Sequence, residues 1–187
     1  KLILNSLLVL IPKKSNKKFK KSFDSISVLL SRYFAGLILQ IFILFIIYTI
    51  LLLIIGTPNA IVIAFLCSLL NLIPFIGPFI GGILMILLTM SSHITQDFST
   101  VILAKAIYVA IGFAIGQVID NFFSQPFIFS NSVRSHPLEI FIVIISGGLL
   151  FGAIGMIAAV PSYTALKVIG KEFLSENRIV KELTKNL

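Results

Sequence analysis

A stretch of 134 residues, 33–166, constrains this chain more than any other feature, because it carries only five charged side chains. Hydrophobic residues make up 58% of the chain and charged residues 12%, whereas a soluble domain has about 25% charged residues. Lipid tolerates such a surface and water does not, so the sequence predicts an all-α integral membrane protein. The five charged residues are Asp97, Lys105, Asp120, Arg134 and Glu139.

The formal net charge of +8 arises at the two ends of the chain. Eight of the fifteen Lys and Arg residues precede Tyr33, and five follow Leu166. Basic flanks hold membrane segments on the cytoplasmic side, so we interpret the charge as topology and expect no nucleic acid as a partner. Both ends are then cytoplasmic, and the connector 91–100, which has no Lys or Arg, lies outside.

Three segments follow from this charge pattern. Residues 1–32 form a basic connector, residues 33–169 a transmembrane domain, and residues 170–187 a cytoplasmic tail. Within the connector, apolar residues recur every three or four positions from Phe19 to Tyr33, which predicts an amphipathic helix in the headgroup region. A solvated connector is the alternative. The chain starts without Met or a signal-peptide layout, and we expect it to be part of a longer protein.

The first half of the transmembrane domain predicts one full span and one hairpin. Residues 33–55 give 23 uncharged positions, about 34 Å of helix, before the breaker 56–59. The apolar segments 60–73 and 80–90 are each too short to cross, so they predict a re-entrant hairpin with its tip at Pro74–Pro78. A single kinked span is the alternative.

The second half repeats the plan. A span at 101–119 and a polar connector at 120–137 precede two apolar legs, 138–146 and 149 onward, that meet at Gly147-Gly148. The second leg ends at Pro161 or continues to Ile169. Two span-and-hairpin units would form an inverted repeat, as in some secondary transporters. Four plain crossings are the alternative, but they place the connector 91–100 in the cytoplasm.

The hairpin tips and a polar stripe are the candidate transport site. A new half-helix at each tip offers free N–H groups to a polar solute, although the glycines could serve only for close helix packing. Gln117, Asp120 and Asn121 share one helical face, and Asp120 is a candidate for ion or proton coupling, with a hydrated helix end as the alternative. The other candidates are Asn71 and Gln40, Pro74, Gly77 and Pro78, His136 and Pro137, and Gly147 and Gly148.

Catalytic and cofactor-binding motifs are missing from the sequence. It contains no phosphate-binding glycine loop, no zinc-protease helix and no serine elbow, so we predict no enzyme and no cofactor. Cys67 is the single cysteine, and no Cys/His cluster predicts a metal site.

Several short motifs occur together in a specific order. In that order and spacing they resemble the autoinducer-2 exporter family, also known as PerM-type permeases, over about Pro12 to Ile169. Ser135, where many relatives have Leu, and Glu139, at a usually apolar position, depart from the family pattern. The motifs are residues 71–82 (Asn-Leu-Ile-Pro-Phe-Ile-Gly-Pro-Phe-Ile-Gly-Gly), Gln117-Val-Ile-Asp-Asn121, Gln125-Pro126, His136-Pro137, Gly147-Gly148, Gly152-x-x-Gly155 and Ala159-Val-Pro161.

The resemblance implies a multi-pass exporter in the inner (plasma) membrane of a bacterium, with further spans ahead of this chain. It also adds Gln125 and Pro126 to the candidate site. The implied solutes are small and polar, such as the signal autoinducer-2, and some members look like sodium/proton antiporters. We therefore expect a secondary transporter driven by protons or sodium, with a non-transporting membrane scaffold as the alternative of another class. Re-entrant backbone must be shielded from lipid, so we also expect a homo-oligomer.

Overall fold

The computed structural model describes residues 16–124 and 136–173, and every element in these ranges is helical. The prediction of an all-α membrane protein is confirmed. Three helical stretches, Lys18–Ile55, Phe98–Phe122 and Leu138–Phe173, are long and apolar enough to cross a membrane by length and composition. Contacts divide the described residues into two units, one of 35–124 and one of 16–34 with 136–173.

Helix α2 (Asn16–Ile55) is continuous over 40 residues. The amphipathic helix predicted in the basic connector and the first predicted span are therefore one helix. No proline occurs between its ends, and the single Gly36 costs only about 1 kcal/mol relative to alanine, so nothing breaks the hydrogen-bond ladder. The helix ends where predicted, because Gly56 and Asn59 both adopt positive φ angles, 72° and 56°.

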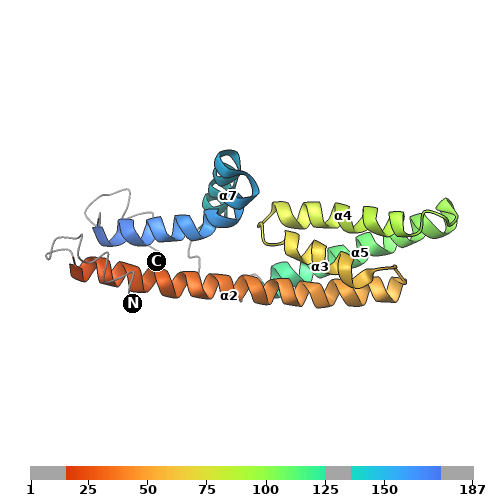
Figure 1. The fold of residues 1–187 in the computed structure, drawn as a ribbon, viewed down its shortest axis with the longest axis horizontal. Helices are drawn as coiled ribbons and strands as arrows, with labels where there is room; N and C mark the ends of the chain where they lie inside the picture. Colours follow the sequence, from red (N-terminus) through yellow and green to blue (C-terminus); the bar gives the residue numbers. More distant parts are fainter. Residues whose placement is uncertain (1–15, 125–135, 174–187) are drawn as a thin grey trace. The chain divides into compact units, whose positions relative to one another are not determined.

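Helices α3 (Ala60–Leu70) and α4 (Ile76–Ser92) form an antiparallel hairpin (Figure 1). Their closest approach lies at two glycines of α4: a Cβ on Gly77 would lie 1.8 Å from the carbonyl oxygen of Leu70, and one on Gly81 would lie 3.2 Å from that of Cys67. A single kinked span is therefore excluded. The re-entrant placement of this hairpin in a bilayer stays a prediction.

The helical stretch after the connector 91–100 runs from Phe98 to Ser124, so it is longer at both ends than the predicted span 101–119. The π-helix η2 (Phe98–Ile102) leads into α5 (Leu103–Ile119), which continues as the π-helix η3 (Asp120–Ser124). The carboxylate of Asp97 caps its start by accepting hydrogen bonds from the hydroxyl and backbone N–H of Thr100, at 2.7 and 2.8 Å. These bonds hold the pKa of Asp97 below its ordinary value.

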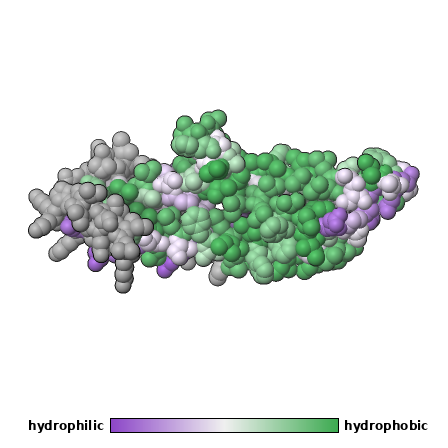
Figure 2. Space-filling model, in the orientation of Figure 1, coloured by the Kyte–Doolittle hydropathy of each residue, from purple (hydrophilic) through white to green (hydrophobic). Residues whose placement is uncertain are grey.

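The core of the 35–124 unit joins all four of its main helices. Leu44 and Leu52 of α2, Cys67 of α3, Met85 of α4 and Val109 of α5 are fully buried and belong to one cluster. On the face that Figure 2 shows, the surface of these helices is largely apolar, and polar residues gather where α4 leads into η2. A buried core inside an apolar exterior is the arrangement expected in lipid.

Helix α7 (Pro137–Phe173) is broken at Gly152, whose φ of 63° and ψ of −148° are not helical. Its two legs fold back on each other, because a Cβ on Gly147 would lie 2.6 Å from the carbonyl oxygen of Gly155. The predicted tip at Gly147-Gly148 is therefore wrong: these glycines lie within the first leg, where the legs approach most closely. The second leg continues through Pro161 to Phe173.

The order of elements is thus helix, hairpin, helix, hairpin. An ion pair joins the start of α2 to the end of α7. Nζ of Lys21 lies 3.1 Å from Oε2 of Glu172. The Lys21 side chain is 71% exposed, so this pair contributes at most about 1 kcal/mol. An inverted relation between the two halves stays a prediction.

Candidate functional site

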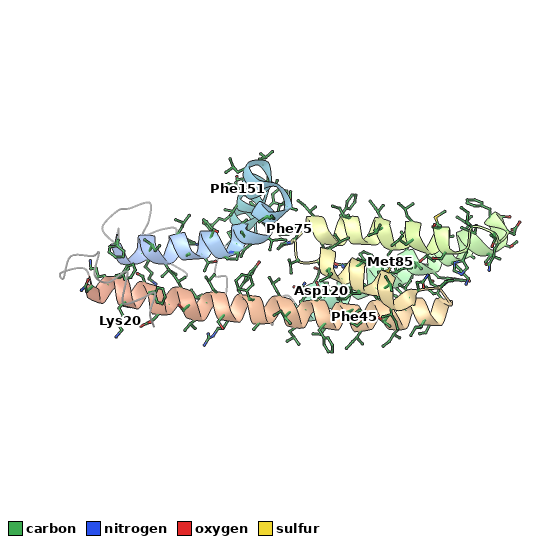
Figure 3. All side chains as sticks on the ribbon, in the orientation of Figure 1. Lys20, Phe45, Phe75, Met85, Asp120 and Phe151 are labelled. Carbon is green, nitrogen blue, oxygen red and sulfur yellow. The ribbon has the colours of Figure 1, made fainter. Side chains whose placement is uncertain are left out.

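Asp120 is the only acidic residue that the structure describes as fully buried, with 0% exposure. It lies at the junction of α5 and η3, beside α2 (Figure 3). Its Oδ2 accepts a hydrogen bond of 2.7 Å from Nε2 of Gln40, which is itself 4% exposed. This bond ties the middle of α2 to the end of α5.

One turn earlier, Gln117 joins three helices. Its Nε2 donates to the hydroxyl of Tyr48 on α2 at 2.6 Å and to Oδ1 of Asn71, the residue that ends α3, at 3.2 Å. Asn71 in turn donates to the carbonyl oxygen of Cys67 at 3.0 Å. The Tyr48 ring stacks on Phe113 of α5, with ring centroids 5.3 Å apart.

We refer to Gln40, Tyr48, Asn71, Gln117 and Asp120 as the polar core. Lipid and apolar side chains offer no hydrogen bonds, so these groups must bond to one another or to a bound ligand. The polar core contains an acid, a phenol and three amides. This set can hold a proton or a cation on the carboxylate and can donate and accept hydrogen bonds with a small polar solute.

The tip of the first hairpin lies next to the polar core in sequence and contains a strained turn. Phe75 has φ 67° and ψ −50°, and the N–H of Ile76 donates to the carbonyl oxygen of Pro74 at 2.8 Å. This is the rare γ-turn, which an aromatic residue adopts only when its surroundings impose it. Pro78 lies inside the first turn of α4, where a missing N–H is tolerated, so the tip is shorter than predicted.

The second hairpin carries a charged cluster that joins its legs. Oε2 of Glu139 on the first leg accepts hydrogen bonds from the Tyr163 hydroxyl at 3.0 Å and from Nζ of Lys167 at 3.3 Å, both on the second leg. The ammonium of Lys167 also lies 5.4 Å from the centre of the Tyr163 ring. We call these three residues the clasp.

The remaining sequence candidates are placed as follows. Asn121 is exposed whereas Asp120 is buried, because successive residues of a helix point in different directions, so the predicted shared face does not include Asn121. His136 is exposed and its Nδ1 accepts from the N–H of Leu138, while Pro137 starts α7. Gln125 and Pro126 lie outside the described residues. Within 16–124 and 136–173 no group of three His, Cys, Asp or Glu residues is arranged to hold a metal ion.

Sequence reasoning did not single out Tyr48, Phe75, Tyr163 or Lys167. Tyr48 carries a polar group within a run of Phe, Leu and Ile, which is a usable signal, since a buried phenol seeks a partner. Lys167 and Tyr163 are four residues apart and so share a helical face, but their partner Glu139 is 24 residues from the nearer one. The predicted hairpin brings the two legs together, but the position of its tip decides which residues face each other, and that tip lies at Gly152.

The comparisons with known proteins agree with this architecture. The model for the AI-2E family transporters matches residues 1–175, which is nearly the whole chain. The chain belongs to the AI-2E transporter family.

Two relatives of this AI-2E family chain come from Bacillus subtilis (strain 168). It is 30% identical over 173 residues to "Putative transport protein YrrI", a match that covers 92% of this chain and 46% of the relative. It is 31% identical over 165 residues to "Putative transport protein YueF", covering 86% and 40%. The chain therefore spans less than half the length of these curated relatives. No solved structure matches it.

The clasp of this AI-2E family protein yields a stability prediction. Glu139→Gln and Lys167→Gln should each lower the free energy of unfolding by about 1–3 kcal/mol, because each change removes a hydrogen bond between charged groups and leaves the remaining partner without its opposite charge. Exchanging the charges, Glu139→Lys with Lys167→Glu, should recover most of that loss. The measurement is unfolding in mild detergent, with the exposed Lys20→Gln as the neutral control. An exchanged protein no more stable than the weaker single variant would contradict the clasp.

Proposed function

We propose that this protein is a multi-pass secondary transporter of a small polar solute and that the polar core is where solute and coupling ion are handled. The single observation that carries the proposal is the buried pair of Gln40 and Asp120 inside an apolar helical unit. An acidic residue at membrane depth is costly and is usually kept for ions, protons or substrates.

The proposed role of each residue follows from the chemistry of its side chain. Asp120 can change charge when it binds a proton or a cation, so it is the coupling residue. Gln117 and Asn71 are neutral amides that donate and accept, so they suit a polar solute with hydroxyl or carbonyl groups. The strained turn at Phe75 follows Asn71 closely and would change conformation as the first hairpin moves.

The solute class comes from the family. Export of a small signal such as autoinducer-2 is the expectation, and sodium or lithium exchange for protons is the second candidate, favoured by the buried carboxylate of Asp120. A non-transporting scaffold is the alternative of another class. It predicts no solute or ion flux that depends on the protein.

The coupling proposal is tested with Asp120→Asn in the full-length protein. This change keeps the shape and the acceptor for Gln40 but removes the charge, so gradient-driven flux should fall at least tenfold while folding and insertion are preserved. Proteoliposomes with an imposed proton or sodium gradient would be assayed for autoinducer-2 flux and for proton release. The matched control is Asp97→Asn, which changes an exposed carboxylate in the connector. Wild-type rates for Asp120→Asn across pH and sodium concentration would show that the residue is not the coupling group.

We further propose that both ends of the chain are cytoplasmic and that the connector 91–100 is outside the inner membrane of a bacterium. Support comes from the basic ends and the absence of Lys and Arg from the connector. Single cysteines at Lys20 and at Thr95, both exposed, in a Cys67→Ala background should be labelled from opposite sides of intact cells. Labelling of both cysteines from outside by one membrane-impermeant reagent would contradict this topology.

A homo-oligomer is the last part of the proposal. The helical hairpins expose large apolar side chains, and Leu149, Leu150 and Phe151 near the α7 tip are 73–84% exposed. Packing between copies would shield the hairpin tips from lipid if they are re-entrant. Native mass spectrometry of the full-length protein should therefore show more than one subunit, and a monomer in both mild detergent and native membranes would refute this expectation.

A further inference from the structure

A groove of about 490 Å³ runs along the outer surface of the 35–124 unit between α2 and α5. Its walls are apolar: Leu51, Ile54 and Ile55 come from α2, and Ile111 comes from α5. Gly112 forms part of the lining, and Leu51 fills the space that a side chain there would need, since a Cβ would lie 2.1 Å from its Cδ1. Ile54 is 80% exposed and Ile111 55%, so the groove opens toward the surroundings of the helices and not toward the core.

One end of the groove is cationic. The lining includes Lys105, the one Lys or Arg residue in the sequence between 33 and 133. Its Nζ donates to the carbonyl oxygen of Gly56 at 3.2 Å and contacts Nε2 of His93 at 2.8 Å. His93 places its Nδ1 2.9 Å from the carbonyl oxygen of Thr89, which only a protonated nitrogen can satisfy. Nε2 of His93 is then the acceptor for the ammonium of Lys105, which has a third N–H to donate to a ligand.

The cation and the apolar walls are aligned with each other along the helices. Seven residues, about 10 Å of helix, separate Lys105 from Gly112. Tyr108 lies between them and is 60% exposed, the kind of amphipathic side chain that gathers at a membrane interface. Lys105 is also next to the end of α2 and the polar connector, so the groove runs from the membrane boundary into the apolar layer.

We propose that this groove binds a phospholipid with a net negative headgroup. One acyl chain lies against Ile54, Ile111 and Gly112, and the lipid phosphate accepts a hydrogen bond from the ammonium of Lys105. The groove has one cation at its polar end and apolar walls beyond it, and such a lipid has an anionic headgroup attached to an apolar acyl chain. This inference requires only that the unit lies in a bilayer, and it is independent of the transported solute and of Asp120.

The strength of the charge preference can be bounded. A Lys near the membrane surface contributes about 1 kcal/mol to the binding of anionic lipid, which corresponds to a roughly fivefold preference. The full-length protein in mild detergent should therefore retain phosphatidylglycerol about fivefold more than phosphatidylcholine in native mass spectrometry. Phosphatidylglycerol should also raise the unfolding temperature more than phosphatidylcholine does.

Four variants separate the headgroup from the acyl chain. Lys105→Gln should abolish the preference, Lys105→Arg should preserve it, and Lys20→Gln, which changes an exposed lysine outside the groove, should leave it unchanged. Ile54→Trp fills the groove from a position that is 80% exposed, so it should fold normally and weaken the binding of both lipids alike. It keeps the test informative if Lys105→Gln does not fold.

Three results would overturn the inference. Equal retention of both lipids by the wild-type protein, or an unchanged preference in Lys105→Gln, would remove the role of the cation. Competition by the water-soluble headgroup glycerophosphoglycerol at the same concentration as the lipid would remove the role of the acyl chain. Unchanged lipid binding in Ile54→Trp would mean that another part of the full-length protein or a second copy covers the groove.

Discussion

The fold depends on one constraint: hydrocarbon offers no hydrogen-bond partner to the backbone, so each interruption of a helix must be closed locally. The break after α2 is closed by the N–H groups of Gly56 and Thr57, which donate to Leu53 and Leu52 at 3.1 and 2.9 Å. The break between α3 and α4 is closed by the γ-turn at Phe75, and the break in α7 is confined to Gly152. The break at Phe75 carries backbone strain, because a residue with a side chain has a positive φ there, and this break follows Asn71 of the polar core closely.

The polar core fixes the positions of helices that are otherwise apolar. Dispersion contacts alone would allow α2 to slide or rotate against α5, but the bonds from Gln40 to Asp120 and from Gln117 to Tyr48 specify one register. Leaving any of these groups without a partner costs about 1–3 kcal/mol, and more for the carboxylate. Under the proposed function, a solute bound here would replace these bonds with its own, which would couple binding to the position of α2 against α5.

Much of this arrangement could be predicted from the sequence, because composition and the lengths of apolar runs decide where helices lie in a membrane. The helical hairpin before Met90, the end of α2 and the family were predicted correctly. The tip of the second hairpin was not, because Gly147, Gly148 and Gly152 look alike in sequence and only the fold shows which one needs a positive φ. The pairing of Gln40 with Asp120 was not predicted, because the two residues are 80 positions apart and the pattern within one helix does not show which residue of another helix it contacts.

The two hairpins share a plan but differ in chemistry. The first ends α3 at Asn71, whose side chain takes part in the polar core, and its turn is strained at a non-glycine residue. In the second, the tip is a glycine with no atom within 4 Å of where a Cβ would lie, and its charged groups sit in the clasp, away from the tip. A repeat of topology therefore does not imply a repeat of function. The proposed solute site therefore lies with the first hairpin, where hydrogen-bonding groups and strain coincide, whereas the clasp joins the legs of the second hairpin at a distance from its tip.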